Sequence, residues 1–148
     1  MDRIAGKTKH GELTLDEIAS LMPGMPEIMV ALGQRYHVMR YACRAGNWPL
    51  GSYQLRAIRK LFTTATLTRP KYREALDRFA ADYLDPLDHA IRAKDWPRVS
   101  ELIERSIDAS DRAHAEWGYA YIRFRMPDTP PSSYAMEPPP ANEGNRSH

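Results

Sequence analysis

An internal repeat does most to limit what this chain can fold into. The segment Ala42-Cys43-Arg44-Ala45-Gly46-Asn47-Trp48-Pro49 returns as Ala90-Ile91-Arg92-Ala93-Lys94-Asp95-Trp96-Pro97, at an offset of 48 residues from Arg44 to Arg92. In each copy an Asn or Asp oxygen can accept the free N–H groups of a new helix, and Pro suits its first turn. Each copy therefore predicts a helical hairpin. Two hairpins in tandem predict an all-α chain folded as an antiparallel four-helix bundle.

Apolar spacing defines the four helices. Apolar side chains recur every three or four residues, as they do along one helix face. We expect helices from Pro26 to a stop at Gly46, from Trp48 to Arg69, from Pro70 to Ala93 and from Trp96 to Trp117. Pro86 lies inside the third helix, and because it has no backbone N–H it predicts a kink there.

The two ends of the chain differ from the middle in composition. Residues 1–13 are polar and predict a flexible N-terminus, and the capping-box spacing of Thr14 and Glu17 predicts a short helix to about Leu21. Residues 14–126 are then the bundle domain, and residues 127–148 a Pro-rich tail. We expect the tail to wrap the surface in extended form and then become disordered. Composition predicts that removing it after Pro127 leaves the helices intact.

Charge and hydropathy exclude several classes of protein. The 21 basic and 19 acidic residues give a net charge of +2, which argues against nucleic-acid binding. No run of about 18 apolar residues exists, so we expect no membrane span. The first ten residues lack the apolar region of a secretory signal, and Cys43 alone cannot form an intrachain disulfide. These features predict a cytoplasmic protein.

Known catalytic signatures are missing from the chain. It has five histidines but no HExxH or CxxC spacing, so we expect no metal site. The paired Glu-x-x-His motifs of di-iron bundles are also absent. There is no Gly-rich phosphate loop and no GxSxG. Small enzymes often lack such signatures, so their absence does not decide whether the chain is an enzyme.

His114 is the residue of most interest, because the spacing puts it on the inner face of the last helix, beside Ser110 and Trp117. A buried histidine needs a hydrogen-bond partner, since an unsatisfied polar group costs ~1–3 kcal/mol. Two interpretations stay open. His114 is either a core histidine bonded to a facing tyrosine or a backbone carbonyl, or a ligand or base in a pocket between helices.

The motif around His114 points to a family. Ser110-Asp111-Arg112-Ala113-His114 has the spacing of the haem-attachment motif C-x-x-C-H, with both cysteines replaced, near the end of the last helix. Residues 42–53 also look like a helix-turn-helix passage of bacterial cytochrome-c-like bundles. Over residues 20 to 126 the chain thus resembles cytochrome c/c′-like helical-bundle proteins with a degenerate attachment motif.

The resemblance implies a retained cavity at His114. Covalent haem c is excluded, because Ser110 and Ala113 cannot form thioethers. A non-covalent haem ligated by His114 remains possible, as does another flat apolar ligand. Haem c is attached in an oxidising compartment, so its loss agrees with a cytoplasmic location.

Aromatic and basic residues on two helices are expected to complete the pocket. The candidates for cofactor binding, besides His114, are Tyr36, His37, Arg40, Trp117, Tyr121 and Arg123. The arginines would pair with carboxylates such as haem propionates. In the alternative interpretation the tyrosines pack against the helices and the arginines stay solvated.

Three functions follow as hypotheses. The first is a small-molecule-binding bundle that holds a haem-like ligand or an aromatic carboxylate near His114. The second is a cofactor-free enzyme with His114 as general base, which needs a closed pocket. The third is an accessory subunit, or a homo-oligomer, that binds a protein partner through its tail and an exposed apolar surface, which needs a large apolar patch outside the core.

Overall fold

The computed structural model describes residues 3–141. It is mostly helical, and helices account for 65% of the chain. The prediction of an all-α chain is therefore confirmed, apart from a short β-hairpin. The elements in order are β1 (Ile4–Thr8), β2 (Gly11–Thr14), α1 (Leu15–Ser20), α2 (Met25–Arg44), α3 (Trp48–Thr68), a 3-10 turn (Pro70–Tyr72), α4 (Arg73–Phe79), a π-helical turn (Ala80–Leu84), α5 (Asp85–Arg92) and α6 (Trp96–Glu116). Within residues 3–141 no helix is long and apolar enough to cross a membrane.

The two copies of the repeat form the predicted helical turns. The Asn47 Oδ1 accepts a hydrogen bond from the Leu50 N–H at 3.3 Å, and the Asp95 Oδ1 accepts one from the Arg98 N–H at 3.1 Å. The residue before each cap has a positive φ, which is +80° at Gly46 but +54° at Lys94. The second turn therefore holds a lysine in the left-handed region that glycine normally occupies.

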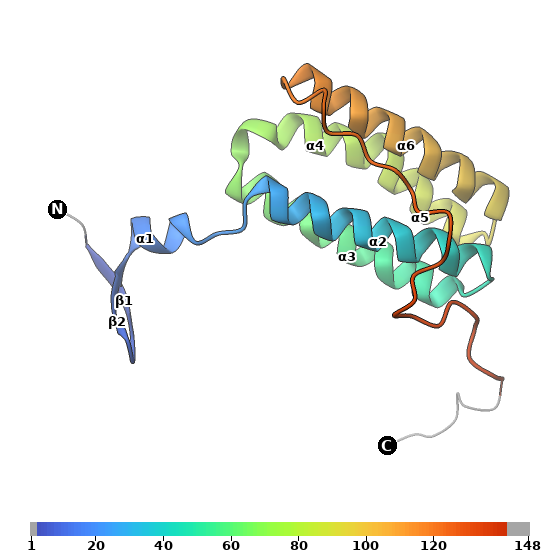
Figure 1. The fold of residues 1–148 in the computed structure, drawn as a ribbon, viewed down its shortest axis with the longest axis horizontal. Coiled ribbons are helices and arrows are strands. Elements are labelled where there is room, and N and C mark those ends of the chain that lie inside the picture. Colours follow the sequence, from blue (N-terminus) through green and yellow to red (C-terminus); the bar gives the residue numbers. More distant parts are fainter. Residues whose placement is uncertain (1–2, 142–148) are drawn as a thin grey trace.

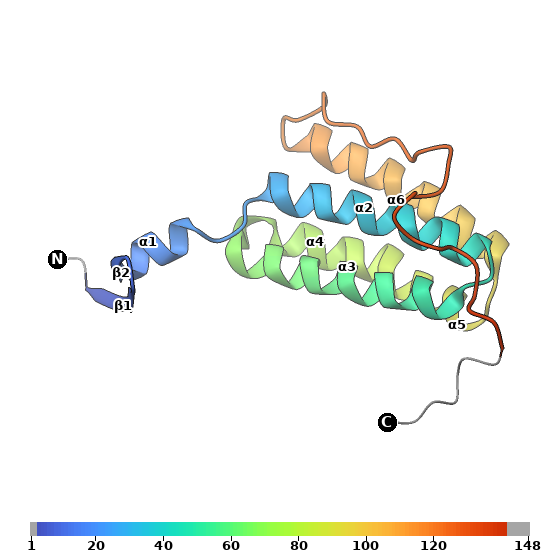
Figure 2. The ribbon, with the colours of Figure 1, turned by 60° about the horizontal axis from the view of Figure 1, so that its bottom comes forward.

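Helices α2 and α3 lie side by side along their whole length (Figures 1 and 2). Their closest approach is near the turn, where Gly51 of α3 faces Cys43 of α2. A Cβ at position 51 would overlap the Cys43 Sγ, so only glycine lets the two backbones come this close. The pair forms the surface on which the later helices pack.

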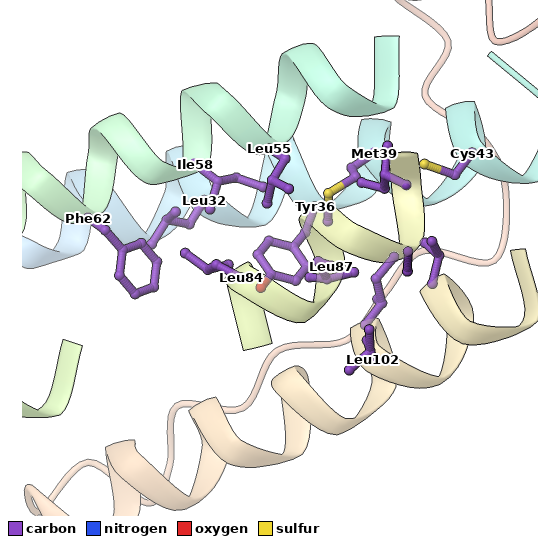
Figure 3. Close-up of a cluster of buried hydrophobic side chains, with 14 of the residues drawn as sticks. Leu32, Tyr36, Met39, Cys43, Leu55, Ile58, Phe62, Leu84, Leu87 and Leu102 are labelled. Carbon is purple, nitrogen blue, oxygen red and sulfur yellow. The ribbon is translucent and has the colours of Figure 1, made fainter. Parts of the chain in front are cut away.

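The main core lies between the α2–α3 pair and the second half of the chain. Figure 3 shows Leu32, Tyr36 and Met39 of α2 and Leu55 and Ile58 of α3 facing side chains from later elements. The partners include Leu84, Leu87 and Leu102. Burial is uneven, however, because α4 buries no residue and α6 buries none beyond Ser106. The end of the body that holds the start of α4 and the end of α6 is thus loosely packed.

The kink expected at Pro86 takes the form of a π-helical turn. The turn covers Ala80–Leu84, and Pro86 follows it at the start of α5. A proline ring clashes with the carbonyl four residues earlier, which here belongs to Asp82. The wider π turn makes room for that carbonyl, and α4 and α5 continue through it as one rod.

The N-terminal segment, predicted to be flexible over residues 1–13, contains regular secondary structure from Ile4 onward. Residues 4–14 form an antiparallel hairpin, with Lys7 paired to Glu12 and a bulge between Ile4 and Gly6. The predicted capping box starts α1, since the Thr14 Oγ1 accepts from the Glu17 N–H at 3.1 Å and the Glu17 Oε2 accepts from the Thr14 N–H at 2.7 Å. The hairpin and α1 form an arm, residues 3–24, that stands away from the helical body (Figures 1 and 2).

The C-terminal tail wraps the body as expected, but it contributes more packing than its composition predicts. The Tyr41 hydroxyl donates to the Pro127 carbonyl at 2.9 Å, and the His37 Nε2 donates to the Thr129 carbonyl at 2.7 Å. Met136 is buried in a second apolar cluster on the outer side of α2. Removal of the chain after Pro127 would uncover that cluster. The disorder predicted for the last residues concerns 142–148, which lie outside the described residues.

The burial of Met136 gives a test of the tail. Met136→Ala should lower the free energy of unfolding by about 2 kcal/mol, because it removes a buried side chain from a packed cluster. Tyr134→Ala is the matched control, since Tyr134 is 48% exposed on the same tail and its loss should change stability by less than about 0.5 kcal/mol. Urea unfolding followed by circular dichroism measures both. Equal stability of the two variants would mean that the tail is not docked in solution.

Candidate functional site

A polar stripe on α6 leads from the core to the loosely packed end of the body. Ser106, Ser110 and His114 are spaced four residues apart, so they lie on one helix face. Ser106 is fully buried, whereas Ser110 and His114 are half-buried. The stripe therefore connects a buried polar group to one that solvent can reach.

The hydrogen bond of His114 defines its chemistry. The Nδ1 lies 2.7 Å from the backbone carbonyl oxygen of Ser110, in its own helix. Because a carbonyl only accepts, the Nδ1 must carry the proton and donate it. The Nε2 of the neutral ring then keeps its lone pair, which is the state in which histidine binds metals and accepts protons.

The location of His114 differs from the sequence prediction. The helical spacing places it on the inner face of α6, but that face is buried only as far as Ser106. Beyond this point α6 extends past the packed part of the body, so His114 lies at its edge rather than inside it. The partner is a backbone carbonyl, which is one of the two partners expected for a structural histidine.

Tyr36 lies at the inner end of the stripe. Its ring packs among Leu84 and Leu87 (Figure 3), and it is 8% exposed. The hydroxyl has no partner in hydrogen-bond geometry, and the neighbouring Ser106 hydroxyl donates to the Ile103 carbonyl at 2.8 Å. Burial raises the pKa of Tyr36 to about 12, and the nearby Ser106 hydroxyl offsets part of that rise. An unpartnered buried hydroxyl is costly and marks a place where a polar group is missing.

An aromatic contact joins the two helix ends at the open side of the body. Tyr72, just before α4, meets Trp117, just after α6, edge to face with ring centroids 4.7 Å apart. Trp117 is still 46% exposed. Trp117 is one of the predicted pocket residues, but the sequence gives no sign of Tyr72 as its neighbour, since the two are far apart in the chain.

The remaining predicted binding residues are not assembled around His114. His37 is bonded to the tail, and Arg40 lies 3.8 Å from the Glu104 carboxylate and 5.9 Å from the centre of the Trp96 ring. Tyr121 is 79% exposed, and Arg123 is exposed as well. The structure thus brings Tyr36 to the α6 stripe but uses His37 and Arg40 for packing and pairing.

Two open hollows in the described part of the chain lie elsewhere. One, of about 340 Å³, is lined by Pro86, His89, Ala90 and Arg98. The other, of about 260 Å³, lies between α3 and α4, with Phe62, Leu76 and Leu84 among its lining residues. Neither contains His114 or Tyr36. A ligand at His114 would therefore be held at the open end of the body, not in a closed cavity.

His114 has no partners for a conventional metal site. Among residues 3–141, no group of three or more His, Cys, Asp or Glu side chains is placed to hold a metal ion. A structural or catalytic zinc needs three or four such ligands. A single imidazole is instead sufficient as an axial ligand of haem, or as a hydrogen-bond acceptor for an organic molecule.

Two polar side chains are buried without having been assigned a role from sequence. The helical spacing predicts Ser106 on the inner face of α6, whereas nothing in the sequence points to Gln54. Gln54 of α3 is fully buried, and its Oε1 accepts from the Arg35 Nη1 at 3.1 Å while its Nε2 has no partner. The sequence does not indicate that Gln54 is buried, because its burial depends on which faces of α2 and α3 meet.

Comparison with known proteins gave no match to a family model, to a curated protein sequence or to a solved structure. The resemblance to cytochrome c/c′-like bundles therefore rests on the residues named above.

The unpartnered hydroxyl of Tyr36 predicts an unusual pair of variants. Tyr36→Phe should leave the free energy of unfolding unchanged or raise it by up to about 1 kcal/mol, because no hydrogen bond is lost. Tyr41→Phe should lower it by about 1 kcal/mol, because the Tyr41 hydroxyl donates to the tail. Urea unfolding at neutral pH compares them. A similar loss in both variants would show that Tyr36 has a partner in solution.

The raised pKa of Tyr36 also predicts an alkaline loss of stability. The unfolded tyrosine ionises near pH 10 and the folded one near pH 12, so the unfolded state loses its proton first as the pH rises. The contribution of this pKa difference to the free energy of unfolding is complete below about pH 10 and is lost as the pH rises to about 12. Between about pH 9 and pH 11 the free energy of unfolding should fall more for the wild type than for Tyr36→Phe. An equal fall in the two proteins would contradict the burial of this hydroxyl.

Proposed function

We propose that this chain is a small-molecule-binding helical bundle, in which the open end of the body holds a ligand near His114. In this proposal α2, α3, the α4–α5 rod and α6 are the four members of an antiparallel four-helix bundle. The chain would then be a relative of cytochrome c/c′-like bundle proteins that has lost covalent haem. The proposal rests on the hydrogen bond from the His114 Nδ1 to the Ser110 carbonyl. Because this bond keeps the proton on Nδ1, the Nε2 of the neutral ring has a free lone pair.

Tyr36 supports the same location. Its hydroxyl is buried without a partner at the inner end of the stripe that His114 terminates. Natural proteins leave few such groups, and a ligand's polar atom is one of the partners that can satisfy them. A ligand that reached from His114 toward Ser106 would pass along Ser110 and approach this hydroxyl.

The chemistry of the site favours a flat apolar ligand with one polar contact. Tyr72 and Trp117 offer aromatic faces and edges at the mouth, and the half-buried side chains of Leu76 and Ile107 pack against the core. Aromatic side chains bind planar molecules through stacking and edge-to-face contacts. An aromatic carboxylate or a haem-like macrocycle has this shape.

Haem fits these residues in part. His114 supplies one axial nitrogen, which is sufficient for a five-coordinate iron. Ser110 and Ala113 cannot form thioethers, so the binding would be non-covalent. Arg40, expected to pair with a propionate, already pairs with Glu104, and that contact would have to change. Haem is therefore the ligand to test first, within the wider class of planar aromatic molecules.

The hydrogen-bond partner of His114 favours a binding role over general-base catalysis. The Nδ1 donates to a neutral carbonyl, which stabilises an imidazolium less than a carboxylate would. The Asp111 carboxylate, three residues away, instead accepts from the Phe124 N–H at 3.1 Å and holds the tail. His114 thus lacks the oriented acid that most general-base histidines have.

Titration with hemin tests the proposal. The wild type should develop a sharp Soret band, and His114→Ala should lose it while the far-ultraviolet circular dichroism stays the same. His89→Ala is the matched control, because His89 is an exposed histidine on α5 and its loss should leave the band unchanged. The stability of His114→Ala should fall by only about 1 kcal/mol, the value of one hydrogen bond.

Other outcomes of the titration decide against the proposal. A broad band of equal intensity in all three proteins means that hemin binds non-specifically. Native mass spectrometry of the purified wild type then searches for another planar ligand, with His114→Ala as the reference. If neither hemin nor a co-purified molecule depends on His114, the histidine has only a structural role.

A further inference from the structure

The Pro-rich tail lies against the outer side of α2 in the manner of a bound peptide (Figures 1 and 2). It contains no helix or strand from Ile122 to Pro140, and six of the fourteen residues 127–140 are proline. Its backbone carbonyls accept hydrogen bonds from side chains of the body, not from a neighbouring strand. Of residues 127–141, only Met136 is buried. One apolar anchor and three carbonyls thus hold the segment.

The side chains that donate to the tail are oriented by the body itself. The rings of His37 and Tyr41 lie one turn apart on α2 and meet edge to face, with centroids 5.5 Å apart. Asn47 is held by its second role, because its Oδ1 caps α3 through the Leu50 N–H. A donor that is already oriented loses little conformational freedom when it binds a carbonyl. These three donors are therefore placed by contacts that do not include the tail.

The apolar cluster that holds the anchor is separate from the main core. It consists of Val38, Tyr41, Ala42 and Met136, with Leu50 packed against it. The main core, between the α2–α3 pair and the later helices, contains none of these residues. Release of the tail would therefore uncover this cluster and leave the main core closed, which is how a locally unfolding segment behaves.

The contacts match those by which proteins recognise Pro-rich segments. Such segments adopt an extended helix before they bind, and they dock against aromatic side chains. Two of the three accepting carbonyls, those of Thr129 and Glu137, directly precede a proline. The residue before a proline is restricted to extended backbone, so these carbonyls are presented at a small entropic cost. The site thus suits a Pro-rich segment that carries one apolar anchor.

We propose that this surface, the tail site, recognises a Pro-rich segment of a partner protein, and that the tail occupies it in the free chain as an internal competitor. The partner segment supplies an apolar anchor in place of Met136. Its carbonyls accept from His37, Tyr41 and Asn47. Covalent attachment gives the tail a high effective concentration at the site. A partner therefore displaces the tail only when its affinity or its local concentration is higher.

A labelled peptide with the sequence of residues 127–140 tests the proposal on the full chain. Fluorescence anisotropy should show that it binds Met136→Ala at least about tenfold more tightly than the wild type, because the competing tail has lost its anchor. Met136→Leu is the matched control, since it keeps an apolar anchor and should bind the peptide as weakly as the wild type. No binding to Met136→Ala, or equal binding to all three proteins, overturns the proposal.

The wild type gives a second measurement, which does not depend on the folding of a variant. Excess peptide, above the roughly millimolar effective concentration of a tethered segment, should shift the NMR signal of the Met136 methyl group toward that of an exposed methionine. A peptide with Met136→Ala should shift it far less. A peptide with Tyr134→Ala should act like the original, because Tyr134 is 48% exposed on the tail. A Met136 signal that no peptide moves overturns the proposal.

The oligomeric state distinguishes a partner protein from a second copy of this chain. Sedimentation equilibrium should show a monomeric wild type, with each tail in its own site. A dimer that Met136→Ala dissociates would mean that the site holds the tail of a second copy, and it overturns the proposal. Hemin binding is a separate outcome, because these experiments alter no residue of the α6 stripe.

Discussion

The rest of the structure depends on the close packing of α2 against α3. Gly51 lets the two helices approach until its backbone meets the Cys43 side chain, and interiors packed this tightly leave no room for an added methyl group. Burial raises the pKa of the Cys43 thiol to about 12, so the group remains protonated and unreactive at neutral pH. The α4–α5 rod and α6 cover the inner side of this pair, and the tail covers its outer side.

The tail shows how a Pro-rich segment can become part of a fold. Proline has no N–H to donate, so such a segment mainly offers carbonyl oxygens. Three side chains on or just after α2 donate to these oxygens, namely His37, Tyr41 and Asn47. Asn47 has two roles, because its oxygen caps α3 while its Nδ2 donates to the Glu137 carbonyl at 3.3 Å. The turn of the first repeat thus fixes both the hairpin and the tail.

The candidate site lies where this packing weakens. The π turn before Pro86 and the absence of buried residues in α4 leave one end of the body without a tight core. Tyr36 keeps a buried hydroxyl unpaired at the inner border of that region, and His114 presents a free nitrogen at its outer border. Departures from good packing and full hydrogen bonding are expected where a protein binds something.

Local signals in the sequence determined the helices and their turns, because capping and periodicity involve residues only three or four apart. Asn47, Asp95 and the Thr14–Glu17 box are examples. The sequence also indicated Tyr36 and His114 as candidates for a site. Tertiary structure alone decided that Met136 is buried. It also placed His114 at an edge, because the depth of a helix face depends on how far its partners extend. Such contacts join residues as much as 92 positions apart, as in His37 and Thr129, and no local pattern specifies them.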